Sequence, residues 1–229
     1  MKNILHDKPS NKLHGRLLYS TKFIGEHSLK GKVILDIGCG YGWFETFAIG
    51  KKAKRIDATE ISENDLYTIR SNINNPKVVT TVASAVKLPF QNKSFDIVVS
   101  WEVLEHIPRN TELRMFSEIK RVLKPDGVFV LSTPYSSVLS FFSDPAWWFV
   151  GHRHYSRNDL ISYSQQAGLF VEKIEVKGKI WELIGNLNMY FCKWILRRKP
   201  LFEKEIQKKI DQEYSSGSGY MTMLAMFKK

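Results

Sequence analysis

Residues 33–45 read Val-Ile-Leu-Asp-Ile-Gly-Cys-Gly-Tyr-Gly-Trp-Phe-Glu, an apolar run that ends at Asp36 and is followed by alternating glycines. The pattern predicts a buried parallel strand that leads through a glycine-rich turn into a helix. A turn without side chains can approach a ligand closely, and the helix N-terminus beyond it favours a negative group. The spacing is not Gly-x-Gly-x-x-Gly, and no Lys-Ser/Thr pair follows. Neither a dinucleotide fingerprint nor a phosphate-binding P-loop therefore fits.

The composition is that of an ordinary globular protein, with 229 residues, 43% hydrophobic and 25% charged. We expect a single domain over residues 1–229 with a substantial core. Cys39 and Cys192 are the only cysteines, so a disulfide framework is not expected and the predicted compartment is the reducing cytoplasm. The sequence shows no secretory leader and no apolar run long enough to span a bilayer.

The net charge of +11 has three interpretations: a polyanionic partner, an anionic membrane surface, or a lysine-rich solvated exterior. Basic residues are spread along the chain, with one dense group at Arg197, Arg198 and Lys199. The solvated exterior is the simplest interpretation.

Strand and helix patterns alternate over residues 32–170. Strands are predicted at residues 33–36, 55–60, 78–82, 95–100, 127–132, 169–176 and 220–227. Helices are predicted at residues 43–50, 64–73, 111–123 and 157–167, the third ending at a Lys-Pro-Asp-Gly stop. Repeated strand–helix–strand units predict an α/β fold with helices on both faces of a parallel sheet.

Two stretches do not fit this alternation, residues 135–155, which are rich in aromatic side chains, and residues 180–211. The second is predicted to form an interrupted apolar helix followed by a charged one. Both follow strands at their carboxyl ends, where α/β folds bind ligands. We expect them to form a lid over an acceptor site.

The glycine turn closely resembles motif I of class I S-adenosylmethionine (SAM) methyltransferases. The likeness extends over residues 32–170 and the last strand, and is nearest to the type 11 group that includes ubiquinone-biosynthesis O-methyltransferases. It implies a Rossmann-like, doubly wound, seven-stranded sheet whose last strand is antiparallel. In that family the turn lies under the methionine part of SAM and the acid at the strand end positions its ammonium group. These roles pass to Asp36, Gly38, Cys39, Gly40 and Gly42.

Other segments carry further cofactor contacts. Glu60 ends the second strand, where a carboxylate can accept hydrogen bonds from both ribose hydroxyls, and Ile61 is placed to pack on adenine. Ser84-Ala85 precedes Leu-Pro-Phe and resembles the family's adenine segment, except that Ser84 replaces the usual aspartate. A hydroxyl can accept the adenine hydrogen bond with a smaller contribution than a carboxylate.

Residues 94–107 form a second family signature, Ser-Phe-Asp-Ile-Val-Val-Ser-Trp-Glu-Val-Leu-Glu-His-Ile. Ser100 and Trp101 are expected to line the cofactor pocket, and Asp96 to brace the start of the strand. The Glu-Val-Leu-Glu-His run resembles a divalent-metal motif of some O-methyltransferases. Many relatives carry the same run without metal, so no metal ligand is assigned.

His152 and His154 are the candidate catalytic residues, because a neutral imidazole can take a proton from an acceptor hydroxyl. His154 can equally hold the lid on the sheet. The expected function is SAM-dependent methylation, at oxygen, of a small apolar or lipid-like acceptor, with S-adenosylhomocysteine as product and with peripheral membrane contact open. The alternatives are an RNA methyltransferase, against which stands the lack of a long basic stripe, and a non-catalytic SAM-binding subunit.

Overall fold

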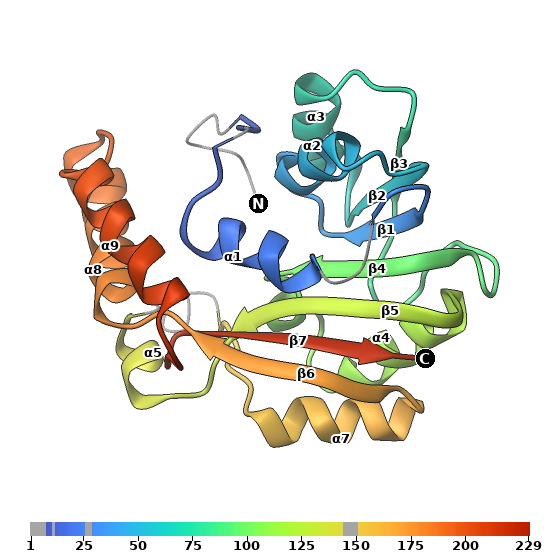
Figure 1. The fold of residues 1–229 in the computed structure, drawn as a ribbon. Helices are drawn as coiled ribbons and strands as arrows, with labels where there is room; N and C mark the ends of the chain where they lie inside the picture. Colours follow the sequence, from blue (N-terminus) through green and yellow to red (C-terminus); the bar gives the residue numbers. More distant parts are fainter. Residues whose placement is uncertain (1–7, 11, 26–28, 144–150) are drawn as a thin grey trace.

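The computed structural model describes residues 8–10, 12–25, 29–143 and 151–229. Within them lies one seven-stranded sheet of order β3-β2-β1-β4-β5-β7-β6 (Figure 1). The strands are β1 (Val33–Ile37), β2 (Arg55–Glu60), β3 (Val78–Val82), β4 (Phe95–Trp101), β5 (Leu123–Pro134), β6 (Phe170–Lys177) and β7 (Thr222–Lys228). Strands β1 to β5 pair in parallel, whereas β7 is antiparallel to both β5 and β6. The predicted α/β fold with an antiparallel last strand is confirmed.

Helices cover both faces of the sheet. They are α1 (Gly15–Ile24), α2 (Trp43–Gly50), α3 (Glu63–Asn72), η1 (Leu104–His106), α4 (Glu112–Val122), α5 (Val138–Ser143), α7 (Arg157–Ala167), α8 (Ile180–Phe191), η2 (Cys192–Leu196) and α9 (Glu203–Ser215). The sequence patterns predict no helix before residue 43, so α1 is an addition. No helix of the described residues has the length and apolar character needed to cross a membrane.

The alternation of side chains along β1 divides the core between the two faces. Leu35 and Ile37 join a buried cluster with α4 and α7. Ile34 joins a second cluster that includes Phe23 of α1 and Phe44 of α2. Successive strand residues point to opposite faces, so a strand covered on both sides must be apolar throughout.

Strand β5 starts earlier than the sequence predicted. The Lys-Pro-Asp-Gly stretch at residues 124–127 lies inside the strand, because Leu123 pairs with Phe95 of β4. The turn signal survives as an irregularity, since Asp126 has a φ of 60° and the pairing register shifts between Phe95 and Ile97. Pairing with the neighbouring strand overrode the local preference for a turn.

Helices α8 and α9 lie together at the left of Figure 1, beyond the end of the sheet toward which the β4 and β5 arrows point. They pack against each other, and α9 also packs against α1. This end carries the loops that follow the parallel strands, and it is where α/β folds bind ligands.

Candidate functional site

The glycine turn is fixed to the neighbouring strand by its own backbone. The amides of Gly38 and Cys39 both donate to the carbonyl of Thr59, at 2.9 and 3.1 Å. The Thr59 hydroxyl donates in turn to the carbonyl of Asp36, at 3.0 Å. The turn is therefore held at the carboxyl ends of β1 and β2 whatever its side chains are.

The three glycines of the turn all have positive φ, but their surroundings differ. A Cβ on Gly38 would lie 2.4 Å from Val103 Cγ2, and one on Gly42 would lie 2.5 Å from Ile73 Cδ1. A Cβ on Gly40, by contrast, would meet nothing within 4 Å. Gly38 and Gly42 are required by packing, whereas Gly40 borders open space that a ligand could fill.

Glu60 stands at the edge of that space. Its Oε1 accepts a hydrogen bond of 2.7 Å from the amide of Gly40. Burial raises the pKa of Glu60, and the Gly40 amide partly offsets the rise. This position at the end of β2 is the one expected for a ribose-binding carboxylate, and Ile61 beside it is 64% exposed, with its side chain available for a ring contact.

Asp36 and Glu45 form a buried carboxyl pair under the turn, each with an exposed fraction of 1% or less. Burial and the neighbouring Glu45 raise the pKa of Asp36 well above its usual value. Burial likewise raises the pKa of Glu45 to about 7. Asp36 Oδ1 has no hydrogen-bond partner among the described residues, so a cationic or hydrogen-bonding ligand would satisfy it.

The end of β4 contributes Ser100 and Trp101. Both are buried, and neither Ser100 Oγ nor Trp101 Nε1 has a hydrogen-bond partner in the described part of the chain. The Trp101 ring packs in the core with Trp43, at 5.7 Å between centroids. At the other end of β4, Asp96 Oδ2 accepts a 2.8 Å bond from the Val33 amide, which confirms that it braces the strand start.

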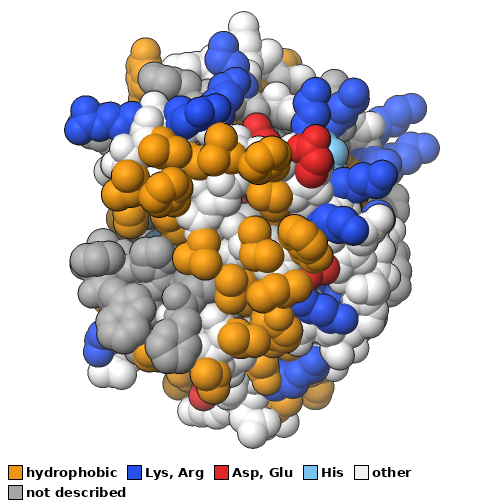
Figure 2. All heavy atoms as spheres, turned by 90° about the vertical axis from the view of Figure 1, so that its left-hand side faces the viewer, with side chains coloured by type: hydrophobic (Ala, Val, Ile, Leu, Met, Phe, Trp, Pro, Cys, Tyr) orange, Lys and Arg blue, Asp and Glu red, His pale blue; other side chains and the backbone are white. Residues whose placement is uncertain are grey.

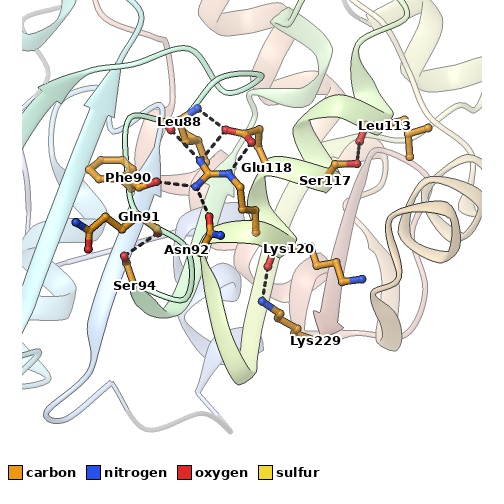
Figure 3. A network of polar contacts seen from close by, with 11 residues as sticks. Leu88, Phe90, Gln91, Asn92, Ser94, Leu113, Ser117, Glu118, Lys120 and Lys229 are labelled. Carbon is orange, nitrogen blue, oxygen red and sulfur yellow. Dashed lines mark hydrogen bonds and ion pairs between the residues drawn. The ribbon is translucent and has the colours of Figure 1, made fainter.

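The Ser84-Ala85 segment leads into a loop held by Arg121, whose partners Leu88, Phe90 and Glu118 are labelled in Figure 3. Arg121 donates to the carbonyls of Leu88 and Phe90, at 2.9 and 2.7 Å, and pairs with Glu118. The Leu88 amide donates back to Glu118, at 2.8 Å. Ser84 Oγ lies 3.5 Å from the Val86 amide, and Ala85 is buried.

The turn borders a cavity of about 640 Å³. Its wall includes Tyr41 of the turn, Glu102 and Glu105 after β4, and residues of α1, α8 and α9. The predicted residues His152 and His154 both line it, whereas Tyr19 is not a lining residue. The Tyr19 hydroxyl instead donates to Glu175.

Histidines gather at one side of the cavity. His106 and His152 lie with their Nε2 atoms 3.2 Å apart and their rings nearly perpendicular. His154 Nδ1 lies 3.4 Å from Ser140 Oγ. When two imidazole nitrogens hydrogen-bond, one carries the hydrogen and the other accepts it, so one of the two Nε2 atoms donates and the other accepts in this pair.

Arg153, which the sequence analysis did not single out, anchors this side of the cavity. Its guanidinium pairs with Glu112 at 2.5 Å and donates to the carbonyls of Leu104, at 3.0 Å, and of Ile107. Tyr155 adds a hydroxyl that donates to Leu104 O and Glu112. These hydrogen bonds hold the chain around His152 and His154 against η1. The feature of the sequence that could have indicated this anchor is the arginine between the two histidines.

The carboxylates of the metal-like motif have protein partners. Glu102 pairs with Arg16 of α1 and accepts a 2.7 Å bond from Ser132 Oγ, while Glu105 accepts one of 3.0 Å from Thr133 Oγ1. Glu182 of α8 completes the floor, and burial raises its pKa to about 7. Among the described residues no group of three His, Cys, Asp or Glu side chains is placed to hold a metal ion.

The predicted lid is described in part. Helices α8 and α9 occupy residues 180–211 as expected, with η2 as the interruption. From the aromatic stretch, the Phe141 ring lies 6.0 Å from His154. Trp147, Trp148, Phe149 and the side chain of Phe142 fall outside the described residues.

The first part of the chain is similar to known methyltransferases. Residues 35–131 match the family model described as a methyltransferase domain. A relative in Mycolicibacterium smegmatis, described as a probable S-adenosylmethionine-dependent methyltransferase, is 32% identical over 108 residues, covering 47% of this chain and 40% of that protein. A mouse mitochondrial protein described as an arginine-hydroxylase is 38% identical over 97 residues, covering 42% of this chain and 27% of its own length.

Less than half of each of these relatives is therefore matched. Among solved structures, the geranyl diphosphate C-methyltransferase of Streptomyces coelicolor, in complex with Mg²⁺, geranyl diphosphate and S-adenosylhomocysteine, has a TM-score of 0.64 at 18% identity. The match covers 91% of this chain and 76% of that one. At this identity the likeness establishes the fold.

Proposed function

We propose that this chain is a SAM-dependent methyltransferase that transfers the methyl group of SAM to an oxygen atom of a small acceptor with an apolar part. The match of residues 35–131 to a methyltransferase-domain model and the likeness to a probable S-adenosylmethionine-dependent methyltransferase support the proposal. The observation that carries the proposal is that the glycine turn and the end of β4 both border the cavity. Tyr41 lies between Gly40 and Gly42 and lines the cavity. Glu102 directly follows the strand end that holds Ser100 and Trp101, and it lines the cavity too.

The residues around the turn suit SAM. The space beside Gly40 is open, Glu60 offers a carboxylate for the ribose, and the Oδ1 atom of buried Asp36 has no hydrogen-bond partner in the described residues. When bound, SAM supplies a methyl group already activated on a positively charged sulfur. The protein's part is then mainly to position the two reactants and exclude water.

The His106–His152 pair is the proposed acceptor of the proton that a hydroxyl loses on methylation. It lines the cavity, and Arg153 fixes the backbone on both sides of it. General base catalysis of this kind contributes roughly 100- to 10,000-fold. His154, bonded to Ser140, is proposed to hold the loop.

The cavity wall supports an acceptor with two different ends. Histidines and carboxylates are among the lining residues, and Leu13, Leu17, Met189 and Ile210 add apolar surface. A hydroxyl would lie against the histidines and an apolar tail against the helices, because pockets combine apolar walls with a few polar anchors.

Calorimetric titration with SAM and with S-adenosylhomocysteine tests the cofactor site. Glu60→Ala should weaken binding at least about tenfold through the loss of the ribose hydrogen bonds. The matched control is Glu63→Ala, an exposed acid on α3 paired with Arg70, which should bind like the parent. Equal affinity of both variants would show that Glu60 does not hold the cofactor.

Transfer of radiolabel from SAM to a panel of phenols, long-chain alcohols and RNA tests the acceptor class. His152→Asn should lower kcat about 100-fold with unchanged SAM affinity, and His154→Asn should lower it less. Labelled RNA whose binding falls steeply with salt would favour the RNA alternative. SAM binding without turnover of any acceptor would favour the non-catalytic subunit.

A further inference from the structure

One face of the α8–η2 helix carries large apolar side chains that no other part of the described chain covers. Leu187, Phe191, Trp194, Ile195 and Leu196 are between 41% and 67% exposed. Val138 and Leu139 of α5, which packs next to α8, are 74% and 44% exposed. We call these seven side chains the apolar patch. Figure 2 shows hydrophobic side chains gathered over this side of the molecule.

The spacing along α8 separates the patch from the cavity. Glu182, Asn186, Met189 and Tyr190 line the cavity. Leu187, Phe191 and Trp194 recur three and four positions apart and fall on the other side of the helix. The helix therefore has one face toward the candidate acceptor site and an opposite apolar face at the molecular surface.

Basic side chains border the patch at the end of η2. Lys193, Arg197, Arg198 and Lys199 lie within the same stretch, and the last three are exposed. None of the four forms an ion pair in the described part of the chain. In Figure 2, Lys and Arg side chains lie along the upper and right-hand margins of the apolar area.

We propose that the apolar patch and its basic border dock this protein on an anionic lipid surface. An in-plane helix with aromatic and aliphatic residues on one face and basic residues beside them inserts its apolar side at the level of the headgroups. Each basic residue near such a surface contributes on the order of tenfold or less in affinity, because it gains attraction to anionic headgroups.

The charges argue against two other occupants. A second copy would bring together two chains that each carry a net charge of +11, which like-charge repulsion opposes. An RNA surface needs basic residues along the path of the phosphates, whereas the centre of this face is aliphatic and aromatic. The proposal is independent of the acceptor and of methyl transfer.

Co-sedimentation of the whole protein with vesicles tests the proposal. The vesicles are phosphatidylcholine alone or phosphatidylcholine with about one-third phosphatidylglycerol. We expect sedimentation with the anionic vesicles, at least about tenfold weaker binding to the neutral ones, and weakening by salt. Lys193→Glu/Arg198→Glu/Lys199→Glu and, separately, Phe191→Ser/Ile195→Ser should each reduce binding at least about tenfold.

The matched control is Lys30→Glu/Lys51→Glu/Lys54→Glu, which makes the same change of charge. These three lysines lie near the amino ends of β1 and β2, whereas the apolar patch lies beyond the carboxyl ends of the parallel strands. It should bind anionic vesicles nearly as the parent does. Equal loss in both triple variants would overturn the proposal, because attraction would then come from total charge. So would a lack of binding to anionic vesicles, or a dimer in light scattering that Phe191→Ser/Ile195→Ser dissociates. Thermal unfolding verifies that each variant is folded.

Discussion

The glycine turn is held by backbone hydrogen bonds between two strands that are neighbours in sequence and space, whereas the cavity is held by side chains from distant parts of the chain. The turn is fixed by the Gly38 and Cys39 amides on Thr59. The cavity depends on Arg153 reaching Glu112, 41 residues away, and on Tyr214 reaching Glu182, 32 residues away. The turn is therefore sensitive to added volume, whereas the cavity is sensitive to the loss of single charged groups.

The largest expected effect is on the cavity side. Arg153→Ala leaves the Glu112 carboxylate buried without its cation, since the two side chains are 15% and 9% exposed. Breaking a buried ion pair costs about 3–5 kcal/mol, which a urea denaturation midpoint would measure. Arg157→Ala is the control, because the exposed guanidinium of Arg157 donates to the Ile174 carbonyl, and its loss should cost about 1 kcal/mol or less. Equal losses of unfolding free energy in the two variants would show that Arg153 does not anchor this side of the cavity.

Within the turn, two alanine substitutions should differ. Gly38→Ala brings a methyl group to 2.4 Å from Val103 at a φ of 78°, and we expect a loss of about 3 kcal/mol from overpacking and backbone strain. Gly40→Ala has open space and should lose only about 1 kcal/mol from its positive φ. The free energy of SAM binding of Gly40→Ala should nonetheless weaken by more than its free energy of unfolding falls. Similar denaturation midpoints would contradict this distinction.

The buried acids under the turn predict a pH dependence. The pKa of Glu45 is about 7 in the folded protein and about 4.3 when unfolded. Its contribution to stability is therefore fully present below about pH 4 and is lost as the pH rises through about 7. Glu45→Gln cannot ionise and should exceed the parent in stability by about 3–4 kcal/mol at pH 8, with the gap shrinking toward pH 5. Denaturation at both pH values measures it, and a gap that ignores pH would refute it.

The turn could be predicted from the sequence because its determinants are local. Only glycine tolerates the positive φ and close packing at positions 38 and 42, so the glycines in the sequence indicate the backbone geometry of the turn. Glu60 was identifiable for the same reason, as an acid at a strand end next to that turn. Its bond to the Gly40 amide joins two features that the sequence had placed separately.

The cavity could not be predicted in the same detail. Arg16 and Arg153 resemble ordinary surface arginines in the sequence, and their partners become visible only when α1 and η1 are in place. The Glu-Val-Leu-Glu-His run suggested a possible metal site. The fold instead gives its carboxylates to Arg16, Ser132 and Thr133. Side-chain partnerships across long separations leave little trace in a single sequence.

The place of β7 between β5 and β6 has a consequence for how the chain acquires its shape. Strand β6 pairs with β7 in the described sheet and has no other neighbour there. During synthesis, residues 170–177 must therefore wait until residues 222–228 have left the ribosome. The edge of β5 that pairs with β7 also stays unpaired until then. Helices α8 and α9 emerge in that interval, so the helical wall can form before the sheet behind it closes, and the last pairing is a slow, non-local one that leaves strand edges open meanwhile.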